Sequence, residues 1–174
     1  MKKLLFLISL AFVINCENGF AQEIKYYVTF YAYAAELIEG LTPGHVIIAF
    51  GKEDDFQMIS ISEGAWGFYP IMNNKIKKKL LLSEEKTGVV NSDDKTLLRN
   101  NIIEARFSKQ VSAQEYNSAY SLITKWNLNR NYHILNSNCV HFAHEIAKLV
   151  NLKVPINVDS MLPENFLIKL VNLN

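Results

Sequence analysis

The stretch that decides the fold is Gly44-His45-Val46-Ile47-Ile48-Ala49-Phe50. After its histidine the run is continuously apolar, which is typical of a short strand covered on both faces. Upstream, residues 24–34 are rich in Tyr, Val, Thr and Phe, which favour a pleated, half-buried surface and predict a first strand. Downstream, a polar turn at 51–55 followed by an alternating segment at 56–62 predicts a hairpin.

Three later segments have the signals of a helix start: a capping box, a run of Asn and Ser, and a proline. They predict helices at 113–126, at 139–150 and from Pro163 onward. The capping box consists of Ser112 and Glu115, whose side chains can each satisfy the other's free backbone N–H.

The remaining segments are less regular. Residues 65–70 are aromatic and lie between Gly64 and Pro70, and we expect them to form a turn packed as a lid on the core. Residues 72–96 show no sustained periodicity and predict an exposed, irregular stretch, whereas 101–111 predicts another strand. We find no internal repeat and no domain boundary, so residues 22–174 are expected to form a single domain.

The start of the chain has the pattern of an export signal. Lys2 and Lys3 precede an apolar run at 4–14, and small residues up to Ala21 predict cleavage before Gln22. We therefore expect a secreted or periplasmic protein. The alternative is a lipoprotein anchored through Cys16, which the preceding Asn15 fits less well because a small residue is usual there.

Composition argues against two classes of function. The formal net charge is +1, so nothing indicates an electrostatic nucleic-acid binder. No segment after the signal approaches the roughly 20 apolar residues that a spanning helix needs, so the mature chain is expected to have no integral membrane segment. The expected partner is instead a peptide, cell-wall or lipid substrate.

Cys139 is the best candidate nucleophile. It is the one cysteine that remains after removal of the signal, so the mature chain can form no internal disulfide. It lies where a helix is predicted to begin, and free N–H groups at a helix N-terminus stabilise a thiolate. Helical periodicity places it on the face of Ala143 and Ile146, toward the sheet. The competing interpretation is a small buried core residue.

A thiol nucleophile needs a base, and imidazole is suited to that role because its pKa lies near neutrality. His141 and His144 are predicted to project away from the thiol, and His133 lies in the preceding connection. His45, at the start of a buried strand, is the remaining candidate.

No metal or other cofactor is predicted. His141 and His144 are three residues apart and could share a zinc ion, with Glu145 as the nearest further ligand type. Two ligands do not make a site, and Cys139 points the other way.

With Gly44-His45-Val46-Ile47 followed much later by Asn138-Cys139-Val140-His141-Phe142, the chain resembles the circularly permuted papain-like superfamily. That superfamily includes the lecithin:retinol acyltransferase group and permuted relatives of the NlpC/P60 peptidases. The resemblance covers about residues 42–150. It implies an α+β fold with an antiparallel sheet packed on the helix that carries the nucleophile, with Cys139 as nucleophile and His45 as general base.

The same resemblance implies a third polar residue that orients the imidazole, about a dozen positions after the histidine. That spacing reaches Gln57. A tight hairpin would instead place His45 opposite Ile61, close to Glu63, so both Gln57 and Glu63 are retained as candidates.

The sequence thus predicts a secreted cysteine hydrolase or acyltransferase that acts on an amide or ester bond, such as a cell-wall peptide amidase or endopeptidase. The alternative is a catalytically inactive papain-like binding module. In that case the aromatic residues Trp66, Phe68 and Tyr69 would form the ligand surface, although core packing is the simpler role for them.

Overall fold

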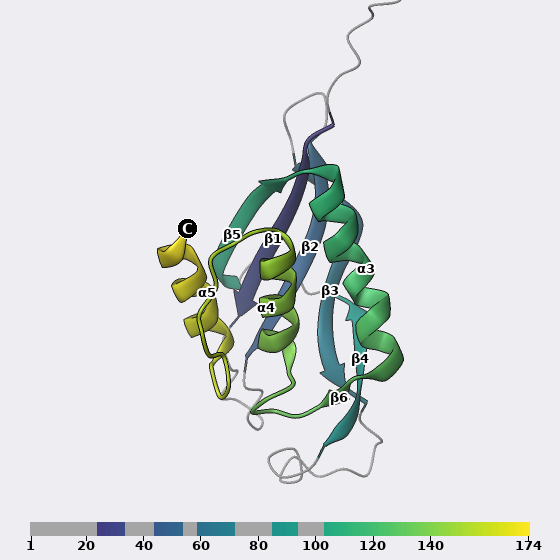
Figure 1. The fold of residues 1–174 in the computed structure, drawn as a ribbon, viewed down its shortest axis with the longest axis vertical. Coiled ribbons are helices and arrows are strands. Elements are labelled where there is room, and N and C mark those ends of the chain that lie inside the picture. Colours follow the sequence, from purple (N-terminus) through teal and green to yellow (C-terminus); the bar gives the residue numbers. More distant parts are fainter. Residues whose placement is uncertain (1–23, 34–43, 54–58, 72–84, 94–102) are drawn as a thin grey trace, which may run out of the picture.

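The computed structural model describes residues 24–33, 44–53, 59–71, 85–93 and 103–174. Within these ranges the chain forms a six-stranded antiparallel sheet and three helices (Figure 1). The strands are β1 (Tyr26–Tyr33), β2 (His45–Glu53), β3 (Ile59–Pro70), β4 (Lys86–Ser92), β5 (Ile103–Val111) and β6 (Asn131–Tyr132). The helices are α3 (Ala113–Asn129), α4 (Cys139–Leu149) and α5 (Pro163–Leu173). The expected α+β class with an antiparallel sheet is therefore confirmed.

Strand β2 lies inside the sheet, whose order is β5-β1-β2-β3-β4-β6. Val46, Ile48 and Phe50 belong to the main core, whereas Ile47 and Ala49 form a second buried cluster on the opposite face. Successive side chains of a strand point to opposite faces. A continuous apolar run is therefore what this position requires, as the sequence predicted.

All three helices lie on one face of the sheet (Figure 1). Helix α4 packs on β2 and β3, between α3 and α5. Its Phe142 is fully buried, with its ring centroid 5.2 Å from that of Trp126 and 6.5 Å from that of Phe68. Burying one such side chain contributes about 1.5–3 kcal/mol, so this aromatic cluster holds α4 firmly against the sheet.

The predicted helix starts are confirmed. The N–H of Glu115 donates to Ser112 Oγ at 3.2 Å, and the N–H of Ser112 donates to Glu115 Oε2 at 2.7 Å, which completes the capping box. Helix α3 continues to Asn129, three residues beyond the predicted end. In the described part of the chain, none of the helices is both long enough and apolar enough to cross a membrane.

Two expectations for the loops were wrong. Residues 65–70 are not a turn, because they form the second half of β3. Trp66 and Phe68 contact the main core, while Gly67 between them faces the other side. Within the stretch 72–96, which was expected to be irregular, Lys86–Ser92 is strand β4 and pairs with β3. Glycines between aromatic residues indicated a turn, but here they belong to an alternating strand.

The two faces of α4 also differ from the helical-wheel prediction. Cys139, Ala143 and Ile146 are buried toward the sheet, as expected, but His144 is buried too. Its ring lies against Phe166 of α5, with 6.4 Å between centroids. The prediction assumed one buried face, whereas α5 covers a second.

Candidate active site

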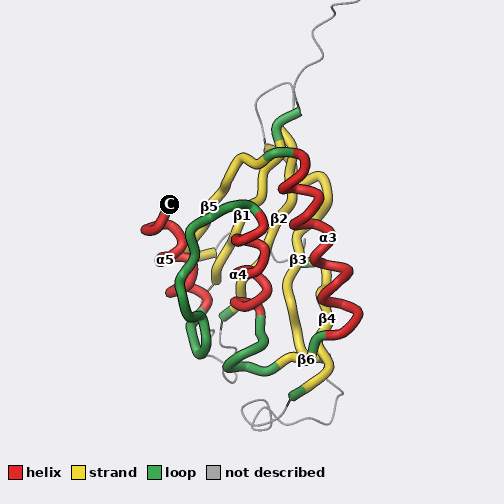
Figure 2. Tube along the Cα trace, viewed as in Figure 1, coloured by secondary structure: helices red, strands yellow, loops and turns green. Residues whose placement is uncertain are grey.

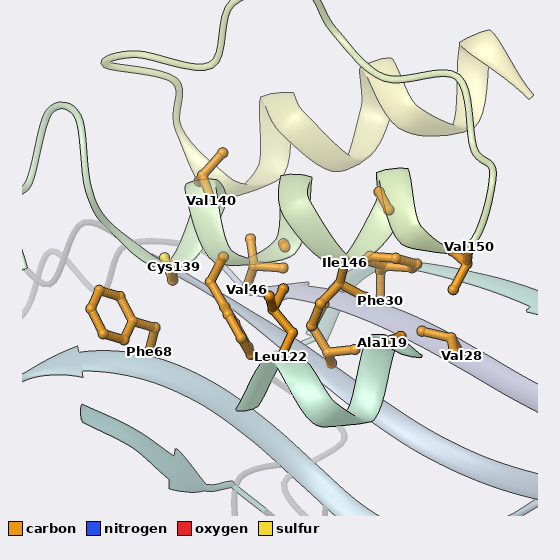
Figure 3. Close-up of a cluster of buried hydrophobic side chains, with 14 of the residues drawn as sticks. Val28, Phe30, Val46, Phe68, Ala119, Leu122, Cys139, Val140, Ile146 and Val150 are labelled. Carbon is orange, nitrogen blue, oxygen red and sulfur yellow. The ribbon is translucent and has the colours of Figure 1, made fainter. Parts of the chain in front are cut away.

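Cys139 is the first residue of α4, and Asn138 is its N-cap. The Asn138 Oδ1 atom accepts hydrogen bonds from the N–H groups of Val140 and His141, which ends the preceding loop and starts the helix. Cys139 is only 4% exposed. Figure 3 shows it on the side of α4 that faces the sheet, with Phe68 and Val46 below it.

Backbone N–H groups surround the Cys139 sulfur. Those of Val46, Val140 and Cys139 itself favour the thiolate and lower the thiol pKa. Burial acts in the opposite direction and is the larger effect, and the Asp93 carboxylate adds to it, so the pKa of Cys139 is raised to about 11. Cys139 is therefore a neutral thiol at rest, with backbone N–H groups nearby.

The contact with Val46 arises where β2 and β3 separate. Their pairing reaches Ile48 and Trp66 and stops there, so the first three residues of β2 are not paired with β3. The N–H of Val46 lies at this opening near the Cys139 sulfur and lowers the thiol pKa.

The His45 side chain lies on the opposite face of the sheet from the Cys139 thiol, although Val46, the next residue in the chain, lies on the same face as the thiol. Val46 belongs to the main core with Cys139, whereas Tyr33, whose ring centroid is 5.8 Å from that of His45, packs against the opposite cluster. The imidazole stacks on the Tyr69 ring, with 4.1 Å between centroids. Gly67 lies beneath it, and a Cβ at that position would collide with His45 Nε2.

Asp93 is the acidic partner of this histidine. Its Oδ2 atom lies 3.8 Å from His45 Nε2. That distance is too long for a hydrogen bond, and Nε2 is buried without a hydrogen-bond partner among the described residues. Tyr69 donates its hydroxyl proton to Asp93 Oδ2. An imidazolium at His45 would therefore face a carboxylate that Tyr69 holds in place.

His45 is neutral in this state, because burial lowers its pKa from 6.5 to about 3. Burial and the hydrogen bond to Asp93 raise the pKa of Tyr69 far above its ordinary value, so Tyr69 stays a proton donor. No hydrogen bond joins Cys139 and His45 in the described structure. The link between them is Val46: it follows His45 in the chain, and its N–H lies near the Cys139 sulfur.

The structure changes the choice of the third residue. Gln57 lies outside the described residues. Glu63 does not approach His45; it accepts a hydrogen bond from Lys52 Nζ at 3.1 Å. Gly51, not His45, pairs with Ile61, because β2 continues to Glu53 and the two strands are joined later than the predicted hairpin. His45 consequently lies beside Tyr69.

Sequence reasoning missed Asp93, because it lies at the end of a strand that was expected to be a loop. Thr87, Val89 and Val90 are β-branched residues that favour a strand, and they were the available signal. The N–H of Asp93 donates to the carbonyl of Ala65 at 2.7 Å. This bond holds Asp93 against β3 near His45.

The other histidines of α4 have partners of their own. His141 Nε2 lies 3.0 Å from Asp159 Oδ1, and His144 Nε2 lies 3.0 Å from the carbonyl oxygen of Pro155. Within the described ranges, no group of three or more His, Cys, Asp or Glu side chains is placed to hold a metal ion.

A surface hollow of about 400 Å³ lies elsewhere, where α3 begins and α4 ends, with Glu115, Leu149 and Asn151 in its lining. Cys139 is at the opposite end of α4, an 11-residue helix about 16 Å long. This hollow is therefore separate from the candidate site.

Comparison of the chain with models of known protein families, with curated proteins and with solved structures found no significant match. The contacts of Cys139, His45 and Asp93 are therefore what supports a functional proposal.

Proposed function

We propose that this protein is a cysteine hydrolase or acyltransferase that cleaves an amide or ester bond. The observation that supports the proposal most strongly is the position of the Cys139 sulfur at the start of α4. Backbone N–H groups near it, including that of Val46, the residue after His45, favour its thiolate form. Within the α+β class we propose a permuted papain-like arrangement, in which the histidine strand precedes the nucleophile helix.

In the proposed reaction His45 takes the thiol proton as the Cys139 sulfur attacks the carbonyl carbon. An S–C bond forms, and the carbonyl oxygen becomes an oxyanion. The C–N or C–O bond then breaks, and the imidazolium returns its proton to the leaving amine or alcohol. Water hydrolyses the resulting thioester, or another acceptor takes the acyl group.

Two features of the fold support these roles. The N–H groups at the start of α4 can donate to a developing oxyanion. Asp93, 3.8 Å from His45 Nε2, would stabilise the imidazolium that forms during attack. Asp93 thus takes the orienting role for which Gln57 and Glu63 were the candidates from sequence.

The proposal requires the imidazole to change its orientation when substrate binds. The thiol and the imidazole are both neutral at rest and lie on opposite faces of the sheet. His45 stands at the start of β2, which pairs with β1 but not with β3. Rotation of its side chain there would bring the ring toward the sulfur.

The expected export of the chain favours a substrate outside the cytoplasm. We propose an amide or ester of a cell-wall peptide as the first class to test, with lipid esters as the second.

Mass spectrometry of the protein treated with p-nitrophenyl acetate tests the proposal. An acetyl thioester should appear on the peptide that contains Cys139, with release of p-nitrophenol. Cys139→Ala should abolish the adduct, and His45→Ala should slow its formation by about 100-fold or more, as for loss of a general base. Glu63→Gln, which removes a charge that binds Lys52 and not His45, is the control and should leave both signals unchanged.

The burial of Cys139 and His45 also supports the second candidate, a binding module without turnover. Such a module would form no acetyl adduct at Cys139. It would also bind its ligand equally well after Cys139→Ser and His45→Ala. That combination of results would contradict the enzymatic proposal.

A further inference from the structure

Asn138 is the residue on which the position of Cys139 depends. Its Oδ1 atom accepts from the N–H of Val140 at 2.9 Å, and its Nδ2 atom donates to the carbonyl of Ile134 at 2.5 Å. These bonds determine which end of the carboxamide faces the helix. Any movement of Asn138 would move the adjoining Cys139 and the N–H groups around its sulfur.

The His141 ring, in the first turn of α4, lies against this carboxamide. Its Nδ1 atom lies 3.0 Å from Asn138 Oδ1, and its Nε2 atom lies 3.0 Å from Asp159 Oδ1. Because both oxygens only accept, the ring donates to both at once when both of its nitrogens carry a proton. The ring therefore lies between the helix cap and an acidic side chain from a different part of the chain. The arrangement is similar to a capping box, where the third helical residue reaches back to the cap.

Asp159 belongs to the loop between α4 and α5, which runs back along α4 toward the end where that helix begins (Figure 2). A second contact joins this loop to the segment before α4, because the N–H of Ser160 donates to the carbonyl of Leu135 at 2.8 Å. Asp159 is thus held close to the segment before α4 independently of His141.

We infer that His141 and Asp159 are positioning residues for Cys139: they hold Asn138, and through it they fix the start of α4 and the place of the Cys139 sulfur there. This inference rests on the proposed function for its purpose, but the geometry that it describes can be measured in the resting protein. Neither residue is assigned contact with the substrate.

Two measurements on the whole chain test the inference. The first is the amide proton shift of Val46 by NMR, and the second is the rate at which iodoacetamide alkylates Cys139 between pH 7 and pH 10. In His141→Ala and Asp159→Ala, the Val46 amide signal should move, because the sulfur near it changes position. The thiol pKa should rise, and alkylation at a given pH should slow by about fivefold.

Asp159→Asn is the conservative variant, since it keeps an oxygen that can face His141, and it should restore both readouts. His144→Gln is the matched control. His144 lies one residue after Ala143 on the same helix and contacts the same loop through Pro155, but it does not touch Asn138. It should lower stability without moving the Val46 signal.

A Val46 amide signal that is unchanged in both alanine variants would overturn the inference, as would an equal change in His144→Gln. These results are independent of the acetylation experiment. A protein that forms no acetyl adduct but shows the Val46 shift would contradict the proposed function and leave the positioning role in place.

Discussion

At the residue scale, the neutral state of His45 determines what Asp93 has to do. Burial lowers the pKa of His45 to about 3, so a proton taken from Cys139 would place a positive charge in a poorly solvated site. Asp93 is the acidic group 3.8 Å from Nε2, and its charge would offset part of this cost. The same charge raises the pKa of the Cys139 thiol. Asp93 therefore opposes the thiolate and favours the imidazolium.

These two effects predict opposite changes in Asp93→Asn. The thiol pKa should fall, because a negative charge near the sulfur is removed. Acetylation of Cys139 by p-nitrophenyl acetate should nevertheless slow by about tenfold or more, since an opposite charge is worth about one pKa unit or more to the imidazolium. The pH dependence of alkylation and the rate of p-nitrophenol release measure the two effects separately.

Glu63→Gln is the control for that experiment. It removes the same charge from β3, where the carboxylate binds Lys52 and not His45. Both rates should remain at the wild-type level. If Glu63→Gln slowed acetylation and Asp93→Asn did not, the assignment of Asp93 would be wrong.

At the scale of elements, strand β3 provides the space that the polar residues need. A Cβ on Gly67 would collide with His45 Nε2 and Asp93 Oδ2, so the missing side chain permits both groups to lie against the strand. Tyr69, two positions further along, lies on the same face and carries the hydroxyl that binds Asp93. One strand thus supplies both the space and the hydrogen-bond donor.

Gly67→Ala should therefore separate His45 from Asp93. We expect a loss of about 1–3 kcal/mol in the free energy of unfolding, as for other overpacked positions, together with slower acetylation of Cys139. Urea denaturation and p-nitrophenol release measure the two changes.

Gly88→Ala is a matched variant on β4, because a Cβ there would collide with the Phe68 ring. It should lower stability by a similar mechanism without the specific loss of acetylation. Equal losses of activity at equal stability in the two variants would contradict the role given to Gly67.

At the scale of the whole molecule, the buried His45 reduces stability at acid pH and the buried Cys139 reduces it at alkaline pH. Below pH 6.5 the unfolded chain binds a proton at His45, whereas the folded protein does so only near pH 3. Stability from this group is therefore complete above pH 6.5 and is lost as the pH falls. Cys139 acts on the alkaline side, because its pKa rises from 9.0 to about 11 on folding, and stability is lost as the pH rises above 9.0.

We predict that His45→Asn removes part of the acid dependence, which for one such group reaches up to about 1.4 kcal/mol per pH unit. Cys139→Ser should likewise flatten the alkaline limb. Urea denaturation at intervals from pH 4 to pH 10 gives both slopes. Curves parallel to wild type in both variants would show that these groups do not titrate as their burial implies.

The sequence by itself determined the elements whose signals are local. The apolar run after His45 predicted β2, the capping box of Ser112 and Glu115 predicted α3, and the polar cap before Cys139 predicted α4. These signals depend on neighbouring residues and on which faces are buried, so they can be read without the rest of the chain. The positions of Cys139 and His45 in their elements followed from the same patterns.

Only the tertiary structure decided how these residues face one another. That Asp93, and not the candidate Glu63, lies beside His45 depended on the β2–β3 register and its bulge, and on strand β4, which lies within a stretch that was expected to be irregular. A shift of one residue in a strand moves a side chain to the other face of the sheet. In this register His45 lies on the opposite face of the sheet from Cys139 and on the same face as Asp93. Packing across the sheet, and not the local sequence, selects the register.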